Sequence, residues 1–400
     1  MCLRRFWLLS FGLYVPVPAP LAPSFLRGLR PGKVFSGAPS SLISSEDFPG
    51  LALAGRRACT CTAPQASPAA KNNGGSGELA GHHWSPHPPH FSARRSNTMN
   101  DRIARAALTR LFEPNDTVGR TLVGRLGAYA ALRLATGAQP AHTLPDVTGE
   151  ELAAALKRWA PRVPDLDPEK DLATIERLGG GFLIPGDEHW PTGLDDLPDA
   201  PFGLWYRGNI GNGIPDPGSC AALAGSRDCT SYGAAVTGDL AYSLAQRGIC
   251  VIAGLAYGID AHAHRAALAG STGEGTATIA VLAGGLDRDY PSGNADLAAA
   301  IRANGLTLSE LPPGSAPTRY RFLQRNRIIA ALAGVTCVVE ARWRSGALNT
   351  AHHAETIARH VAAVPGSVHS ANSAGCHRLL KEGAAELVTD AAELTELLAS

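Results

Sequence analysis

The sequence predicts an α/β fold for residues 219–400, with an extended Rossmann-like, doubly wound and mostly parallel sheet. Short, nearly continuous apolar segments alternate there with stretches of helical periodicity, a pattern typical of βαβ units whose sheet is covered on both faces. Several of these apolar segments run directly into glycine-rich turns. A small all-helical domain is predicted to precede this region.

The amino-terminal part of the chain differs from the rest. Residues 1–98 are rich in Pro, Gly, Ser and Ala and show neither helical nor strand periodicity, which predicts disorder or a non-native extension. The chain has two methionines, Met1 and Met99, and Met99 opens the first helical segment. We therefore expect translation to start at Met99. The first 17 residues mimic a signal peptide but are too short to span a bilayer, so no membrane association is predicted.

The next two segments are short. Apolar residues at helical spacing predict a small helical domain over residues 99–178. Residues 179–218 hold strand-like apolar groups and then a Gly/Asn/Pro-rich connector, so we expect an edge segment and a linker there.

Alternation begins at residue 219 and defines the elements of the α/β domain. Short apolar runs predict strands at Cys220–Ala224, Cys250–Ala253, Thr278–Leu282, Leu306–Leu308, Val335–Glu340 and Val361–Val364. The longer segments between them predict helices at Ser231–Gln246, Asp260–Ala269, Asn294–Asn304, Phe322–Leu332 and Leu348–Arg359. Because parallel strands end at one edge of a sheet, the glycine-rich turns should meet in one crevice.

Composition restricts what this crevice could bind. The net charge is +1, so any nucleic-acid site must be a local patch. The eight cysteines show no zinc spacing, so we expect free thiols in a reducing cytoplasm, with no metal and no cofactor. Glycines and helix amino termini suit an anion, although glycines also serve merely to close tight turns, and that alternative stays open.

Arginines and aromatic residues favour a nucleic acid. Arg227 follows the first strand, the segment Thr318–Arg327 carries four arginines and no acid, and Arg342 and Arg344 follow another strand. Guanidinium groups grip phosphates, and interleaved aromatic rings stack with unpaired bases. The aromatic candidates are Tyr232, Tyr257, Tyr320, Phe322 and Trp343, of which Phe322 has apolar surroundings that favour a core position.

Seven motifs occur in order within residues 225–368. They are GSRDCTSYG (Gly225–Gly233), AGLAYGIDAHAH (Ala253–His264), TIAVLAGGLDRDYP (Thr278–Pro291), LSELPPG (Leu308–Gly314), FLQRNRIIAALA (Phe322–Ala333), VVEARWRSGALNTA (Val338–Ala351) and VPGSV (Val364–Val368). This set resembles the DNA-processing protein A (DprA/Smf) family. The resemblance implies a cytoplasmic, homodimeric protein that binds single-stranded DNA in a basic pocket and helps to load RecA recombinase.

The resemblance also implies roles for individual residues. Phosphate contacts would come from Arg227, Arg325 and Arg327, and anion nests from Gly225, Ser226, Gly254, Gly258 and Gly346. Arg344 belongs to the same predicted DNA-binding set, and Asn326 is expected to shape its loop rather than read a base. No catalytic residue is implied.

The chain departs from the family pattern in three places. Tyr257 stands where an arginine usually precedes the G-I-D motif, which removes a charge and adds a ring. The helical region resembles a sterile-alpha-motif-like or helix-hairpin-helix domain, yet Asn115–Gly119 lacks a glycine-rich hairpin, which puts its DNA contact in doubt. We expect no winged-helix domain, because Ser400 follows soon after the last predicted element.

The main alternative is an enzyme, a Rossmann-like nucleoside-monophosphate phosphoribohydrolase. Its P-G-G-x-G-T-x-x-E signature is absent, since Gly284 and Gly285 are followed by Leu286. The turn that begins at Gly225 also lacks the G-x-G-x-x-G of dinucleotide-binding proteins. We therefore predict a protein that is not an enzyme, with a purely structural partner-binding module as a third possibility.

The start-site hypothesis has a direct test. If residues 1–98 are not part of the folded protein, a chain that begins at Met99 should match the full-length chain in melting temperature and in affinity for oligo-dT. A lower value of either would contradict the hypothesis.

Overall fold

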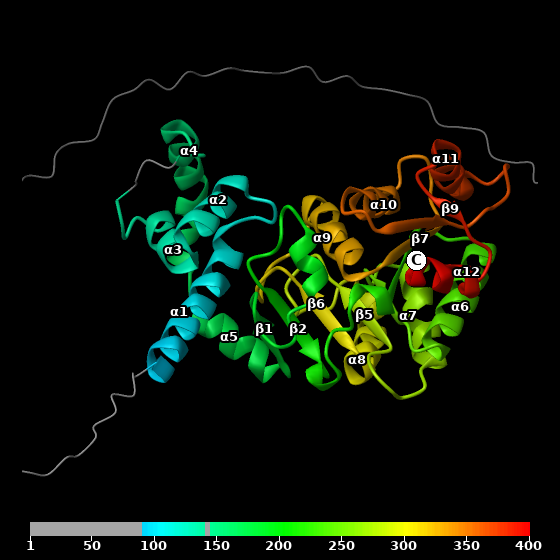
Figure 1. Ribbon diagram of the computed structural model, residues 1–400, viewed down its shortest axis with the longest axis horizontal. Coiled ribbons are helices and arrows are strands. Elements are labelled where there is room, and N and C mark those ends of the chain that lie inside the picture. Colours follow the sequence, from blue (N-terminus) through cyan, green and yellow to red (C-terminus); the bar gives the residue numbers. More distant parts are fainter. Residues whose placement is uncertain (1–89, 141–144) are drawn as a thin grey trace, which may run out of the picture. The chain divides into compact units, whose positions relative to one another are not determined.

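The computed structural model describes residues 90–140 and 145–400 (Figure 1). The disorder predicted for residues 1–98 falls mostly outside the described residues. Helix α1 (His90–Leu111) begins upstream of Met99. No helix in the described part of the chain is both long and apolar enough to cross a membrane.

A nine-stranded sheet forms the centre of the fold, with the order β1-β2-β6-β5-β4-β3-β7-β8-β9. The strands are β1 (Gly180–Leu183), β2 (Leu204–Gly208), β3 (Cys220–Gly225), β4 (Cys250–Ala253), β5 (Thr278–Val281), β6 (Leu306–Ser309), β7 (Val335–Glu340), β8 (His360–Ala363) and β9 (Glu386–Leu387). Strand β2 is antiparallel to β1 and β6, and every other neighbouring pair is parallel. The predicted mostly parallel α/β sheet is therefore confirmed.

The chain changes direction across the sheet between β3 and β7. It adds strands outward from β3 to β6 and then returns to place β7 on the other side of β3. Open α/β sheets commonly bind ligands at such a topological switch point, outside the carboxyl ends of the strands.

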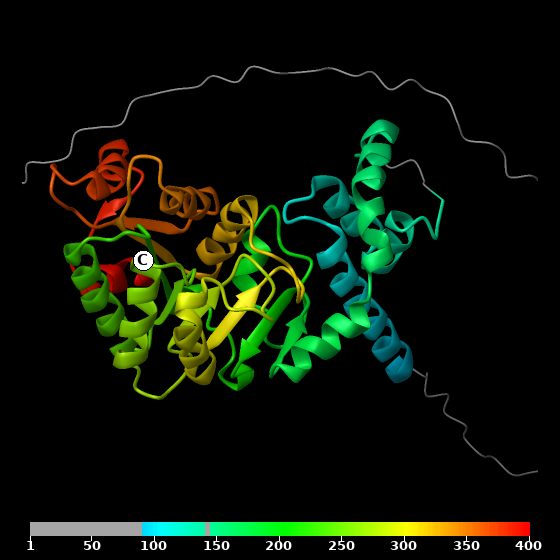
Figure 2. The same ribbon diagram turned by 180° about the vertical axis from the view of Figure 1, so that it is seen from behind.

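Helices cover both faces of the sheet (Figure 2). They are α6 (Ser231–Gln246), α7 (Ile259–Gly270), α8 (Ala295–Asn304), α9 (Arg319–Leu332), α10 (Gly346–Thr356), α11 (Ala374–Glu382) and α12 (Ala391–Ala399). Because strand side chains alternate between faces, Leu223 of β3 packs in the cluster of α6 and Ala222 packs in the cluster of α9. Both faces are consequently covered mainly by buried apolar side chains.

The helices before the sheet have a core of their own. They are α1, α2 (Thr117–Leu126), α3 (Ala128–Ala135) and α4 (Gly149–Trp159), whereas Ile175 of α5 (Pro168–Arg177) packs with strand residues of the sheet. Leu108, Leu122, Leu134 and Trp159 are buried together in this core. A capping box at Thr148 begins α4. The boundary of this region as a separate domain remains a prediction.

His264 of α7 is a buried titratable group in the sheet-facing layer. Thr278 Oγ1 donates to Val251 O at 2.6 Å, so the ring Nδ1, 2.8 Å from that hydroxyl, acts as the donor to it. Burial, with Arg325 nearby, lowers the pKa of His264 to about 3. Between pH about 3 and about 6.5 the ring therefore stays neutral in the folded protein, whereas an unfolded histidine is charged.

This difference predicts acid sensitivity. Below pH about 6.5 His264 binds a proton in the unfolded chain but not in the folded protein. The free energy of unfolding should therefore fall by about 1.4 kcal/mol for each unit by which the pH is lowered, down to about pH 3. Denaturant unfolding of the wild type and of His264→Asn at several pH values measures this contribution as the difference in slope. Equal slopes would show that His264 titrates normally in the folded state.

Candidate nucleic-acid interface

The predicted site residues gather at the carboxyl edge of the parallel strands. Gly225, Ser226 and Arg227 follow β3, and Gly254 and Gly258 follow β4. The first two loops touch, because Ile259 N donates to Ser226 O at 3.1 Å. Arg344 and Gly346 follow β7 and are exposed, and residues 325–327 lie on α9.

Arg227 and Phe322 form the centre of this edge. The guanidinium carbon of exposed Arg227 lies 4.9 Å from the centroid of the Phe322 ring, a cation–π contact. The Tyr290 ring lies 5.8 Å from the same ring. The apolar neighbours of Phe322 suggested a core position, but Phe322 is only half-buried, because it lies in the largely exposed first turn of α9. Tyr257 and Tyr290 are each 50% exposed.

Arg325 lies beneath this ring and is 7% exposed. Its Nη1 donates to Val281 O at 2.5 Å, and its guanidinium carbon is 5.8 Å from the Phe322 centroid. Burial lowers the pKa of Arg325 to about 10, while the Asp260 charge opposes this effect. Arg325 is thus still charged at neutral pH, but its position favours supporting Phe322 over contacting a long stretch of backbone.

Glycine is required at position 254 because a neighbouring side chain approaches its backbone closely. A Cβ on Gly254 would overlap the Arg325 guanidinium. The Gly254 amide is not open to a phosphate, because it donates to Asp260 Oδ2 at 3.1 Å, as does Ala256 N at 3.2 Å. Ser226 N likewise donates to Glu340 O at 2.8 Å. The anion nests predicted at Gly254 and Ser226 are therefore already filled by acceptors of the protein itself.

Gly258 has a different structural reason. Its φ of 75° lies in the region that favours glycine, and a Cβ there would overlap Ser226 O. A Cβ on Gly225 would overlap the Ile259 side chain. The closure of a tight turn, the alternative that the sequence left open, explains Gly258, and room for the Ile259 side chain explains Gly225.

The prediction that Arg327 contacts phosphate is wrong for the folded protein. Arg327 is 0% exposed, and its guanidinium bonds to Glu310 at 2.8 and 3.0 Å and to Asp199 at 3.0 Å. Burial raises the pKa of Glu310, and the Arg327 charge opposes that rise. Residues five positions apart on a helix differ in direction by about 140°, so Arg327 points inward while Phe322 points outward.

Asn326 connects α9 to the start of α10. Its Nδ2 donates to Gly346 O at 3.2 Å and to Asn349 Oδ1 at 3.1 Å. These contacts fit the predicted loop-shaping role. They hold in place the turn that carries Arg344 and Gly346.

A carboxylate occupies the helix amino terminus at the switch point. Glu340, at the end of β7, accepts from Thr230 N at 2.8 Å and from Thr230 Oγ1 at 2.6 Å, directly before α6. A Cβ on Gly233 would overlap this carboxylate. This is the position where a dinucleotide-binding Rossmann fold places a phosphate. In the described residues, no group of three metal-ligating side chains was found.

The chain is similar in sequence and in fold to known proteins. The model of the family described as DNA recombination-mediator protein A matches residues 181–399. The chain belongs to this family, the DprA/Smf family. A DNA-processing protein DprA of Mycobacterium tuberculosis is 42% identical over 313 residues, which cover 75% of this chain and 76% of that protein. DprA of Streptococcus pneumoniae is 41% identical over 203 residues, 51% of this chain and 69% of that protein.

A solved structure extends the similarity to the fold. The X-ray structure of DprA from Streptococcus pneumoniae matches with a TM-score of 0.59 and 31% identity, over 74% of this chain and 97% of that one. The DprA/Smf family is named for DNA processing and not for a catalysed reaction.

Sequence reasoning missed the acids that organise the DprA/Smf motifs. Asp260, in the first turn of α7, accepts hydrogen bonds from the loop amides of Gly254 and Ala256. Glu340, at the end of β7, accepts hydrogen bonds from Thr230. The signal for Glu340 was its place at a buried strand end, one strand away from a helix amino terminus.

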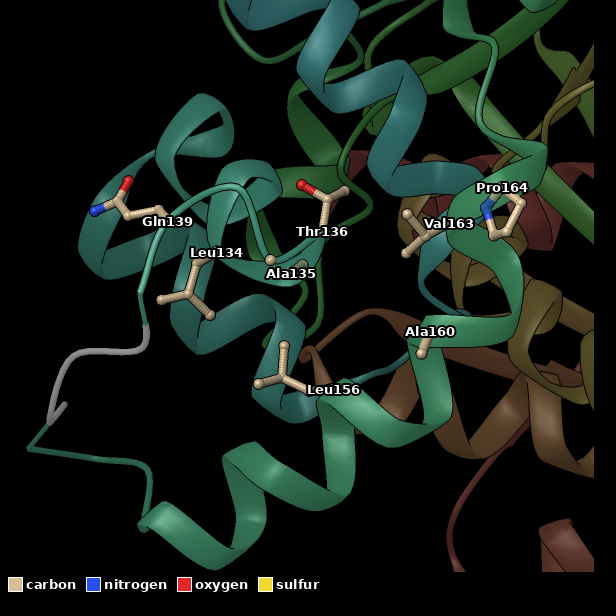
Figure 3. Close-up of a pocket in the computed structure, with 9 residues that line it drawn as sticks. Leu134, Ala135, Thr136, Gln139, Leu156, Ala160, Val163 and Pro164 are labelled. Atoms are coloured by element: carbon tan, nitrogen blue, oxygen red, sulfur yellow. The ribbon is translucent and has the colours of Figure 1, made fainter. Parts of the chain in front are cut away.

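A separate hollow of about 470 Å³ lies between α3, α4 and the 3-10 helix η1 (Ala160–Asp165) (Figure 3). Its walls include Leu134, Leu156 and Val163. It contains none of the predicted site residues, and its apolar lining suits no phosphate.

The revised role of Arg327 makes a stability prediction. Arg327→Ala leaves two carboxylates without their partner, Glu310 being buried, and should lower the free energy of unfolding by about 3–5 kcal/mol. Arg344→Ala, a matched removal of an exposed arginine, should change it by less than about 0.5 kcal/mol. Chemical denaturation measures both. An Arg327→Ala variant as stable as the wild type but deficient in DNA binding would restore the original assignment.

Proposed function

We propose that this chain binds single-stranded DNA at the carboxyl edge of its parallel strands and does not transform it chemically. The observation that carries the proposal is the exposed Arg227 guanidinium held 4.9 Å from the centroid of the Phe322 ring, which the exposed Tyr290 ring also contacts. A cation on a rigid aromatic support is placed to bind a phosphate without first losing much conformational freedom.

Exposed rings beside Arg227 favour an unpaired strand over a duplex. Tyr257 and Tyr290 present half of their surface to solvent. Bases of a duplex are already stacked on each other, whereas bases of a single strand can stack on aromatic side chains. Tyr257 stands where the family usually has an arginine, so this chain would exchange one ionic contact for a stacking contact at that position.

The rival proposal, a nucleotide-processing enzyme, needs an open anion site at the switch point. The Glu340 carboxylate already bonds to Thr230 there, and a nucleotide phosphate would meet a like charge in a buried place. This contact favours a binding protein over a nucleotide enzyme.

Three finer parts of the proposal depend on the family resemblance. They are assistance in loading RecA recombinase during recombination or natural transformation, a homodimeric state and a cytoplasmic location. The family's description as a DNA recombination-mediator protein supports the first of them.

Arg227 provides the test of DNA binding. Arg227→Ala should weaken binding to all single-stranded sequences alike, because phosphates carry no sequence information. It should also lower the slope of log K against log salt by about 0.7. Arg227→Lys keeps the charge but loses the bidentate fork, so its affinity should be intermediate. Fluorescence anisotropy with labelled oligo-dT at several salt concentrations measures both quantities.

Arg247→Ala is the matched control. Arg247 is exposed at the opposite end of α6, next to the amino-terminal edge of the sheet, and its loss removes the same charge. Its salt slope should equal that of the wild type. If Arg227→Ala retains wild-type affinity and slope, or if Arg247→Ala weakens binding equally, the site is misplaced.

A further inference from the structure

Trp343 is an unusually exposed aromatic residue in the loop between β7 and α10. Its exposure is 57%, whereas Trp159, Trp190 and Trp205 are buried. Tryptophan is enriched at binding interfaces, because its ring offers a large apolar face together with a polar N–H group. Neither the family match nor the site described above gives Trp343 a role.

A cation backs one face of this ring. The Arg378 guanidinium carbon, from α11, lies 5.3 Å from the Trp343 centroid. Arg378 Nε donates to Glu382 Oε1 at 3.0 Å, one turn later on the same helix, which fixes the guanidinium. We call the Trp343 ring and the Arg378 guanidinium behind it the Trp343 platform.

The loop beneath the platform is held firmly. Ala341 N donates to Asn372 O at 2.6 Å, and Gly375 N donates to Ala341 O at 2.7 Å. Arg342 Nε donates to Asn372 Oδ1 at 3.0 Å. These bonds fix the backbone on one side of Trp343, so its ring is displayed in advance of any binding partner.

The platform is continuous with the proposed DNA site. Arg342 forms an ion pair with Asp228, the residue after Arg227. Ser226 Oγ also donates to Asp228 at 2.6 Å. The loop that displays Arg227 and the loop that displays Trp343 are therefore tied together by one carboxylate.

We propose that the Trp343 platform is a second contact for the same DNA strand, on which an unpaired base stacks. The inference rests on the proposed function. Exposed Arg344 follows the ring in the chain and Arg378 lies behind it, so its surroundings attract a polyanion more than an apolar protein surface. A strand held at Arg227 by its phosphates would continue across the Asp228–Arg342 pair to the platform.

Affinity measurements test the stacking contact. Trp343→Ala should weaken binding of a long oligo-dT about tenfold, and Trp343→Phe should retain most of the affinity. The salt slope should stay unchanged in both variants, because a stacking ring neutralises no phosphate. Tyr129→Ala, which removes a ring with 53% exposure from α3, is the matched control and should bind as the wild type does.

Fluorescence provides a direct readout. The difference between the emission of the wild type and that of Trp343→Phe isolates the Trp343 signal, and oligo-dT should quench this signal and protect it from acrylamide. Wild-type affinity of Trp343→Ala alongside lost affinity of Arg227→Ala would overturn the platform and leave the proposed function standing. If Trp343→Ala changes the sedimentation coefficient but not the affinity for oligo-dT, the platform is overturned as a DNA contact in favour of a protein interface. Failure of the wild type to bind oligo-dT would overturn the proposed function itself.

Discussion

The Glu340 carboxylate holds together the part of the fold on which the site depends. It extends from the end of β7 to Thr230, directly before α6, and so joins the two halves of the sheet at the switch point. Partial positive charge at a helix amino terminus needs a negative partner, and here the protein supplies its own. The Glu340 carboxylate consequently occupies the base of the crevice. The residues that can contact a ligand, Arg227 among them, lie at its exposed rim.

The arginines of α9 differ in their surroundings, and few of them can reach a ligand at this occupied crevice. Three residues of one motif have three surroundings: Phe322 projects from the edge, Arg325 supports it from below, and Arg327 is an ion-paired core residue. A buried cation is tolerated only with its acids in place, as Glu310 and Asp199 are. The number of arginines in a motif therefore overstates the positive charge that reaches a ligand.

Local periodicity predicted the fold well and the site only in part. Strands such as Val335–Glu340 read as unbroken apolar runs because both faces of the sheet are covered, so their boundaries could be set from the sequence. Strand β9 has two exposed residues and gives no such signal. The contacts of Arg327 with Glu310 and of Asp260 with Gly254 join groups whose pairing depends on where loops and helices meet, which no local pattern encodes.

The glycines at this edge also show that a sequence pattern does not by itself reveal its structural cause. Glycine after a strand is compatible with a phosphate nest, with a tight turn or with room for a neighbouring side chain, and the sequence pattern is the same in all three cases. Gly258 satisfies the second condition through its φ of 75°, and Gly254 satisfies the third through the Arg325 guanidinium. If backbone amides at this edge are already bonded within the protein, affinity for a polyanion must come from side chains. Those side chains are a few exposed arginines, each held against an aromatic ring or a fixed loop.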